Sequence, residues 1–183
     1  MKTILNAALC ATVCALAATA AEPPQISRIY DGELTELERE LVPLAEAMPA
    51  DKYNFAPTNG EFHGVRTFAL QVRHLAYIIY DVSAAVLEEK NPSETAENEN
   101  GPAALESKDQ IVQYLKDALA YGHKAMASLT NANQLDMVKS AFGNGKAPRI
   151  SMASIAVWHS YDHYGQMVVY ARMNGVIPPA SRR

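Results

Sequence analysis

The sequence predicts an all-α protein, a four-helix bundle preceded by a cleavable signal peptide. Four long segments carry apolar residues at three- and four-residue spacing, which is the period of an amphipathic helix. The connections between them are rich in Pro, Gly and Asn, and no segment alternates apolar and polar residues as a strand would. Four such helices joined by three loops are typical of a bundle. The sequence has no internal repeat at a solenoid period.

Residues 1–20 have the features of a secretory signal peptide. Lys2 precedes a run of apolar and small residues, and Ala18-Thr19-Ala20 matches a small-x-small cleavage pattern. A retained membrane anchor has less support, because the run is short for a bilayer span and is followed by Glu22-Pro23-Pro24 rather than by basic residues. We therefore expect cleavage near Ala20, a mature domain of residues 21–183 without an integral membrane segment, and export to the periplasm or the medium.

Both cysteines, Cys10 and Cys14, lie within this predicted signal peptide. A lipidated cysteine normally follows a small residue, whereas Cys10 follows Leu9 and Cys14 follows Val13, so we do not expect a lipoprotein. The mature chain then contains no cysteine. This excludes disulfides, thiolate nucleophiles and Cys-ligated metal centres, so any metal must be bound by His, Asp or Glu.

The charge of the chain disfavours a nucleic-acid partner. The formal net charge is -4, from 16 Lys and Arg against 20 Asp and Glu, and it becomes more negative when Lys2 is removed with the signal peptide. A nucleic-acid-binding domain usually has a basic patch, and this sequence contains no basic block. We therefore expect no nucleic-acid partner.

The first two helices are predicted at residues 25–47 and 68–90. In the first, leucines and other apolar residues alternate with acidic residues at helical spacing, and the helix stops near Pro49. A loop rich in Pro, Asn and Gly follows, and Thr67 is a suitable N-cap for the second helix. The second helix is apolar on nearly all faces, which indicates packing on several sides.

The last two helices follow two further connections. The acidic segment 91–106, which Pro and Gly interrupt, is predicted to be an exposed loop, and Ser107 caps a third helix that ends near Thr130-Asn131. Ser151 opens a fourth helix that runs to about Asn174 and is closed by Gly175. Between them, Gly143-Asn144-Gly145-Lys146 lacks the Ser or Thr and the preceding strand of a phosphate loop, so it is predicted to be a turn.

His159 and His163 are the most informative residues for function. Four residues apart on a helix, they lie one turn apart on the same face, where they can share a metal ion. Both replace apolar residues on the inward stripe of the fourth helix, and buried imidazoles need partners for both ring nitrogens. Because Ser160 stands where a zincin has its catalytic Glu, the pair does not predict a metalloprotease.

A third ligand would strengthen a metal-site prediction, and His74 is the best candidate. It lies in the most apolar helix, whereas His63 lies in a loop and His123 lies beside the main apolar stripe of its helix. Taken alone, His74 is better explained as a core histidine bonded to a backbone group. Together with His159 and His163, it completes a set of three imidazoles from two helices.

At these residues the chain resembles the DinB-like metalloprotein family. Two segments carry the resemblance: YNFAPTNGEFHGVRTFALQVRHLAYIIYD, which contains His74, and WHSYDHYGQMVVYARMNGVIPP, which contains His159, His163 and the Gly-x-x-Pro-Pro that closes the helix. The resemblance covers essentially the whole mature chain. It implies a four-helix bundle that binds a divalent metal through one His of the second helix and a His-x3-His of the fourth, which agrees with His74, His159 and His163.

Three neutral imidazoles with open coordination suit zinc, nickel, iron or manganese. The family includes thiol-dependent S-transferases and a thiol-dependent isomerase, together with many members of unassigned function, and its members often form homodimers. The resemblance therefore implies a metal-dependent hydrolase or transferase acting on a small-molecule substrate, or alternatively a non-catalytic metal- or ligand-binding module. The sequence leaves open whether the protein is an enzyme, and it identifies no catalytic acid or base.

Several other polar residues have two interpretations each. Asp81 and Asp162 either orient the imidazoles through hydrogen bonds or are simply solvated. Gln166, like Tyr161 and Tyr164, either lines a pocket or takes part in packing. His63 and Glu61 precede the second helix and could exchange protons at the site, although a surface position is the simpler expectation.

Overall fold

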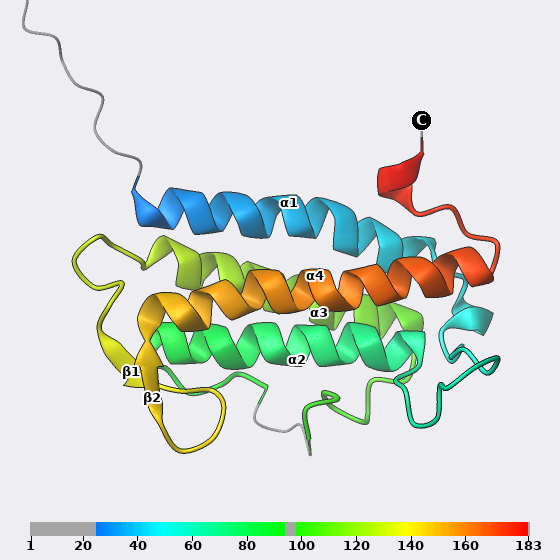
Figure 1. Cartoon of the computed structure of the whole chain (residues 1–183), viewed down its shortest axis with the longest axis horizontal. Coiled ribbons are helices and arrows are strands. Elements are labelled where there is room, and N and C mark those ends of the chain that lie inside the picture. Colours follow the sequence, from blue (N-terminus) through cyan, green and yellow to red (C-terminus); the bar gives the residue numbers. More distant parts are fainter. Residues whose placement is uncertain (1–24, 94–97, 183) are drawn as a thin grey trace, which may run out of the picture.

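The structure, a computed structural model, describes residues 25–93 and 98–182. Its fold is a bundle of four long helices (Figure 1), which confirms the predicted all-α class. The helices are α1 (Ile26–Ala47), α2 (Phe68–Leu87), α3 (Lys108–Ala127) and α4 (Arg149–Met173). Two short 3-10 helices, η1 (Ala50–Lys52) and η2 (Pro179–Ser181), follow α1 and α4. The predicted signal peptide, residues 1–20, lies outside the described residues.

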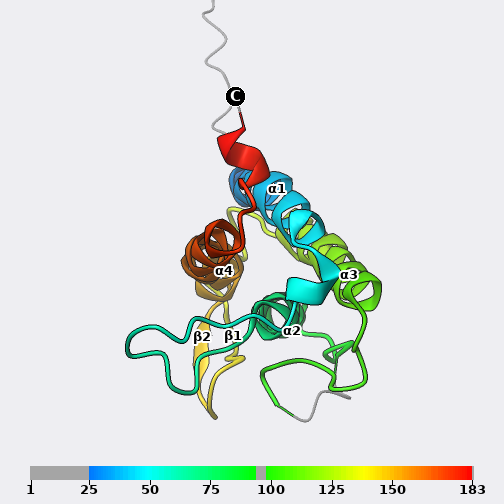
Figure 2. The ribbon, with the colours of Figure 1, turned by 90° about the vertical axis from the view of Figure 1, so that its right-hand side faces the viewer.

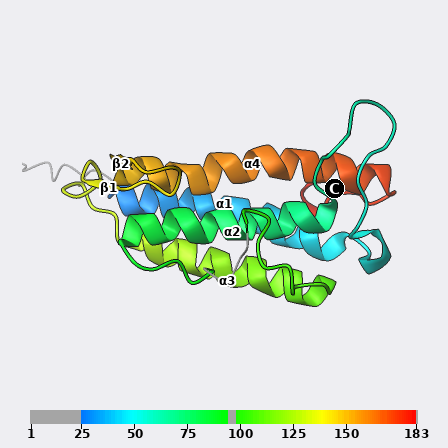
Figure 3. The same cartoon turned by 90° about the horizontal axis from the view of Figure 1, so that it is seen from below.

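Each helix packs against two neighbours. Viewed along the bundle in Figure 2, α1 and α2 lie on one diagonal and α3 and α4 on the other. The main contacts are accordingly those of α1 with α3 and α4, and those of α2 with α3 and α4. Figures 1 and 3 show that α1 and α4 run in one direction while α2 and α3 run in the other. The neighbours α2 and α3 are therefore parallel.

This parallel arrangement explains the length of the connection between α2 and α3. A tight turn joins antiparallel helices, whereas parallel neighbours need a crossover that returns along the bundle. The crossover, residues 88–107, begins at the far end of α2 and comes back to its first half, where Arg73 donates hydrogen bonds to the Asn100 and Leu105 carbonyl oxygens, both at 3.2 Å. The crossover thus brings loop backbone against the middle of the bundle.

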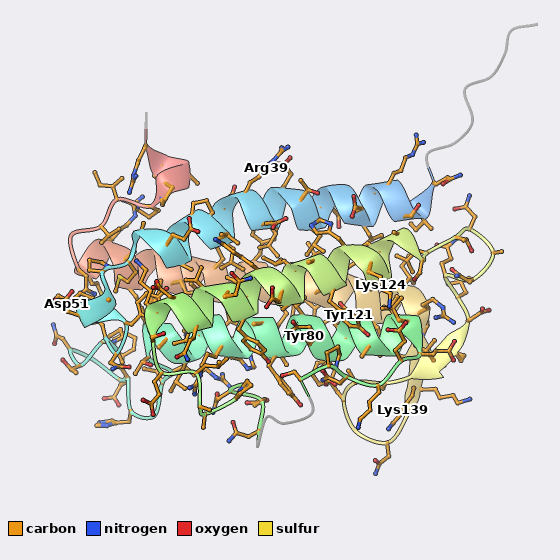
Figure 4. The ribbon with its side chains drawn as sticks, turned by 180° about the vertical axis from the view of Figure 1, so that it is seen from behind. Arg39, Asp51, Tyr80, Tyr121, Lys124 and Lys139 are labelled. Carbon is orange, nitrogen blue, oxygen red and sulfur yellow. The ribbon has the colours of Figure 1, made fainter. Side chains whose placement is uncertain are left out.

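The core combines one apolar stripe of α1 with the nearly all-apolar helix α2. Leu34, Leu37, Leu41 and Leu44 of α1 are fully buried, as the predicted stripe requires. On the other side of α2, the Tyr80 ring lies beside the Tyr121 ring of α3, with centroids 5.6 Å apart (Figure 4). No helix among the described residues is long and apolar enough to span a membrane.

The predicted caps of α2 and α3 are confirmed. The Thr67 hydroxyl accepts a hydrogen bond from the Leu70 N–H at 3.3 Å, and Ser107 forms a capping box with Gln110. Three helix boundaries differ from the prediction. Helix α4 begins at Arg149, two residues before the predicted Ser151, and Pro148 at its N-cap offers no side-chain hydrogen bond. Helix α2 stops at Leu87 rather than near residue 90, because Glu88 adopts the left-handed conformation at φ 55°. Helix α3 stops at Ala127, also a few residues early.

A short β-hairpin precedes α4 and was not predicted. Strand β1 (Met137–Lys139) pairs antiparallel with β2 (Lys146–Pro148). Three residues per strand are too few to produce a recognisable alternation. Gly143 and Asn144 form the turn between the strands, which confirms that prediction, and Lys146 begins β2. At the junction with α4, Arg149 contacts the Val86 carbonyl oxygen and the Glu88 carboxylate, which ties the hairpin to the end of α2.

Candidate metal site

The structure brings His74, His159 and His163 together. His74 comes from the first half of α2, and the other two come from the middle of the antiparallel neighbour α4. Ring centroids are separated by 5.2 Å for His74 and His159, 4.7 Å for His74 and His163, and 4.6 Å for His159 and His163. One nitrogen of each ring lies within 4.8 Å of the others, so the three residues could hold a metal ion.

Burial keeps these imidazoles neutral. His74 and His163 are only 3% and 6% exposed, and His159 is partly exposed. Burial lowers the pKa of His74 and of His159. Burial, reinforced by the neighbouring rings of His74 and His159, lowers the pKa of His163 to about 4. Neutral imidazole is the form that binds metals, so near neutral pH the cluster has the required protonation state.

A backbone carbonyl determines which nitrogen of His74 carries the proton. The Nδ1 atom of His74 lies 2.6 Å from the Glu99 carbonyl oxygen in the crossover. Because a carbonyl only accepts hydrogen bonds, Nδ1 is the protonated nitrogen and Nε2 has a free lone pair. This is the arrangement in which metal-bound histidines are usually held by their surroundings.

The free lone pair of His74 faces a second ring nitrogen. The Nε2 atoms of His74 and His159 lie 3.0 Å apart. Two lone pairs at this distance repel each other unless a proton or a cation lies between them. Two ligands of a tetrahedral zinc ion with bonds of about 2.0–2.1 Å would be separated by roughly 3.3 Å. The donors present therefore suit a shared metal ion in both chemistry and spacing.

Two arginines hold the crossover against His74. The Arg66 guanidinium donates to the Asn100 side-chain oxygen at 2.7 Å and also contacts the Glu99 carboxylate. Arg73 bonds to the carbonyl oxygens of the same segment. These contacts position the Glu99 carbonyl group over the ring. The sequence contained no signal for this partner, because any loop residue can supply a backbone carbonyl.

His163 is held by a side chain instead. Its Nδ1 atom contacts the Oε1 atom of Gln71, a residue of α2 that is 2% exposed. An amide oxygen accepts a hydrogen bond, so Nδ1 of His163 is protonated and Nε2 is left free. Gln71 lies three residues before His74, on the same face of α2. This three-residue spacing from His74 is the signal that the sequence offers for Gln71.

The other polar residues considered from the sequence do not belong to the cluster of three histidines. His63 is exposed in its loop and does not belong to the cluster formed by the three histidines. His123 bonds to two carboxylates of α1. Burial raises the pKa of Asp81, whose carboxylate accepts a hydrogen bond from Asn91 at 3.1 Å. Asp162 is exposed and lies within hydrogen-bonding distance of Gln166.

Two aromatic side chains considered from the sequence lie next to α1 rather than at the cluster. Tyr161 and Tyr164 pack edge to face with centroids 6.3 Å apart, on the side of α4 that faces α1. Trp158 is 57% exposed, and its ring lies edge-on to His159 at 5.6 Å. Only Trp158 of these aromatic residues touches the cluster.

A cavity of about 570 Å³ lies toward the C-terminal end of α2. Its wall includes Tyr77 and Asp81 of α2, Asn91 and Ser93 of the crossover, and Lys139 of the hairpin. None of the three histidines lines it. The cluster is therefore separate from this cavity.

Comparison with known proteins assigns the chain to a family. The family model of the DinB superfamily matches residues 33–167, a stretch that includes all three histidines, and the chain belongs to this superfamily. The predicted resemblance is thus confirmed.

A solved structure has the same fold. The crystal structure of a DinB-like protein from Bacillus cereus superposes with a TM-score of 0.66 at 16% sequence identity, covering 82% of this chain and 93% of that one. No curated protein matches the chain.

Proposed function

We propose that the protein binds one divalent metal ion through His74, His159 and His163 and uses it to act on a small-molecule substrate. The observation that carries the proposal is the convergence of three imidazoles, two of which hold a proton on an Nδ1 atom bonded to a residue outside the cluster. Glu99 and Gln71 accept hydrogen bonds from two of the rings, so that their Nε2 atoms face the centre of the cluster.

Zinc is the metal that this donor set favours. The donors are three neutral nitrogens, and zinc sites with three protein ligands keep a further position open for water or substrate. Nickel, iron and manganese also accept imidazole and remain outcomes of the metal analysis. A divalent ion bound here would supply Lewis acidity and lower the pKa of a water or thiol that it binds.

Within that chemistry we favour hydrolysis over thiol transfer. The predicted signal peptide supports export to the periplasm or the medium, where low-molecular-weight cytosolic thiols are scarce. The chain's own contribution is to hold protons on the outward ring nitrogens and to shield two of the rings from water. Mass spectrometry of exported protein would test the location, because it would show whether the mature chain begins near Ala20.

A non-catalytic metal-binding module is the second candidate. It is favoured by the position of the cavity near the C-terminal end of α2, which none of the three histidines lines. The proposal also includes a homodimer through the outer face of α4, where Trp158, Val169 and Met173 are all more than half exposed. Light scattering on the purified mature protein would measure the mass of the assembly.

The first prediction concerns metal content. Protein purified without a histidine tag should contain about one divalent ion per chain, whereas the double variant His159→Ala, His163→Ala should contain none. His63→Ala is the matched control, since it removes an exposed histidine from a loop and should leave the metal content unchanged. Elemental analysis measures all three proteins. Unchanged metal content in the double variant would overturn the proposal.

Activity separates the two candidates once metal binding is established. Ester, amide and thiol-conjugation substrates should be tested on wild-type protein and on the double variant side by side. Turnover that requires the histidines supports an enzyme. Inactivity across all these classes supports the non-catalytic module.

A further inference from the structure

A chain of hydrogen bonds leads from His163 to the surface of the bundle. The Nδ1 atom of His163 contacts the Oε1 atom of Gln71. The Nε2 atom of Gln71 donates to the Oε1 atom of Gln166 at 3.0 Å. The Nε2 atom of Gln166 in turn donates to the carboxylate of Asp162 at 3.4 Å. The chain starts on α4, passes through α2 and returns to α4 one turn away from His163.

The carboxylate at its outer end determines the direction of the whole chain. An ionised carboxylate only accepts hydrogen bonds, so Gln166 must turn its NH₂ group toward Asp162 and its oxygen toward Gln71. Gln71 must then turn its NH₂ group toward Gln166 and its oxygen toward His163. The last member, Nδ1 of His163, can only be a donor. Each amide orientation thus follows from the previous one.

We infer that Gln71 is a positioning residue that holds His163 as the Nδ1–H tautomer, with Gln166 and Asp162 fixing the orientation of the Gln71 amide. This role of Gln71 deepens the proposed metal function. Its consequence for metal binding rests on that proposed function. With Nδ1 protonated, Nε2 of His163 keeps its lone pair for the ion. With the other tautomer, Nε2 would carry a proton and could not bind a metal.

Gln166 and Asp162 are needed because the amide group of Gln71 can rotate. His74 is held by a backbone carbonyl, which cannot exchange its oxygen for a donor. The Gln71 amide can rotate by half a turn and present NH₂ to His163, which would select the tautomer that does not bind metal. Gln71 and His163 are both buried, so water does not readily replace either partner.

The central experiment compares Gln71→Leu with Gln71→Glu. Leucine removes the acceptor, whereas a glutamate carboxylate still accepts from Nδ1. Gln113→Leu, on the exposed face of α3, is the matched control. Zinc affinity is measured by competition with a chromophoric chelator. The tautomer of His163 is measured separately on metal-free protein, by long-range ¹H–¹⁵N correlation NMR of the ring.

We expect Gln71→Leu to lose about 10- to 100-fold in zinc affinity, the usual effect of removing a residue that orients a metal ligand. Its His163 ring should show protonation at Nε2. Gln71→Glu and Gln113→Leu should keep the Nδ1–H tautomer and an affinity close to wild type. Wild-type affinity together with an Nδ1–H ring in Gln71→Leu would overturn the inference.

A second pair of variants tests the outer part of the chain. Gln166 is exposed, so its replacement should not prevent folding even if Gln71→Leu does. Gln166→Leu should shift the His163 tautomer and weaken zinc binding, whereas Gln166→Glu still accepts from Gln71 and should restore both. Equal spectra for the two Gln166 variants would contradict the inference. If the wild-type protein binds no divalent metal, the proposed function fails, but the tautomer measurement on metal-free protein still decides the role of Gln71.

Discussion

At the scale of single residues, His123 shows what neighbours do to a histidine outside the cluster. Its ring joins α3 to α1, with Nδ1 lying 2.6 Å from the Asp31 carboxylate and Nε2 lying 3.0 Å from the Glu38 carboxylate. Burial by itself would lower the pKa of His123, but hydrogen bonds to these two carboxylates outweigh burial and raise it. Both ring nitrogens have acceptors, so the charged form is the one that the folded protein stabilises.

The raised pKa gives the sign of a pH-dependent effect on stability. The stabilisation from His123 should be fully present below the unfolded pKa of about 6.5 and should be lost as the pH rises through the higher folded pKa. We expect His123→Gln to lower the free energy of unfolding by about 0.5–1 kcal/mol at pH 6, because the side chains involved are partly exposed. At pH 9 the effect should be smaller. Equal losses at both pH values, measured by urea unfolding, would contradict this account.

The three clustered histidines should respond to pH in the opposite sense. Burial lowers the pKa of His74 and His159 and lowers that of His163 to about 4. Protons compete with the metal for the same lone pairs, so the lower pKa values should preserve metal binding below the ordinary histidine pKa of about 6.5. Their stabilisation of the fold is present above that pH and is lost as the pH falls toward 4.

Metal release during acid titration measures this prediction. Wild-type protein loaded with zinc should release its ion with a midpoint below pH 6.5, as detected by a colorimetric indicator in the filtrate. The release midpoint of a denatured sample provides the reference, because its histidines have unperturbed pKa values. A midpoint at or above that of the denatured sample would show that the folded site does not favour neutral imidazoles.

At the scale of the helices, two glycines lie in very different surroundings. A Cβ atom added to Gly122 of α3 would lie 3.0 Å from Leu34 Cδ2 and 3.3 Å from Ile79 Cγ2. Gly122 thus allows α3 to approach α1 and α2 closely. A Cβ atom added to Gly165 of α4 would meet nothing within 4 Å. Glycine is therefore needed for close packing at Gly122, whereas Gly165 has space for a larger side chain.

Alanine at these two positions should change stability in opposite directions. Gly122→Ala should destabilise the protein by about 1 kcal/mol, since overpacking of a closely packed core costs about 1–3 kcal/mol and the better helix propensity of alanine returns up to about 1 kcal/mol. Gly165→Ala should stabilise it by about 0.5–1 kcal/mol through propensity alone. Urea unfolding of both variants beside wild type tests the pair, and a stabilised Gly122→Ala would contradict the described packing.

At the scale of the whole molecule, the histidine cluster links α2 to α4 near the middle of the bundle. A metal bound there would crosslink two helices that otherwise contact each other through side-chain packing and the Gln71 hydrogen bonds. The crossover adds a third segment through the Glu99 carbonyl. Metal binding should therefore stabilise the entire fold rather than one local element.

This linkage predicts a shift in thermal stability. Zinc at 100 times its dissociation constant should stabilise the native state by about 2.7 kcal/mol, because the ion binds the folded form in preference to the unfolded one. For a chain of this size, the melting temperature should rise by roughly 5–10 °C. The double variant His159→Ala, His163→Ala should show no such rise. Calorimetry with and without zinc provides the measurement, and a similar rise in the double variant would place the ion elsewhere.

Much of the architecture follows from local patterns in the sequence. The spacing of Leu34, Leu37, Leu41 and Leu44 marks the buried stripe of α1, and Thr67 and Ser107 mark the starts of α2 and α3. The placing of His159 and His163 on one inward face follows from helix periodicity in the same way. The choice of His74 required the further argument that the most apolar helix is the most buried.

Only the tertiary structure determines the contacts between residues that are far apart in the chain. The approach of His74 to His159 depends on the relative register of two antiparallel helices, and the role of Glu99 depends on where a long crossover returns. Gln71 contacts His163 across 92 positions of sequence. Helix periodicity is a property of neighbouring residues and carries no information on such registers, which the packing of the whole bundle determines. The sequence by itself therefore determined the helices and the candidate ligands, whereas the fold determined how protons are distributed around them.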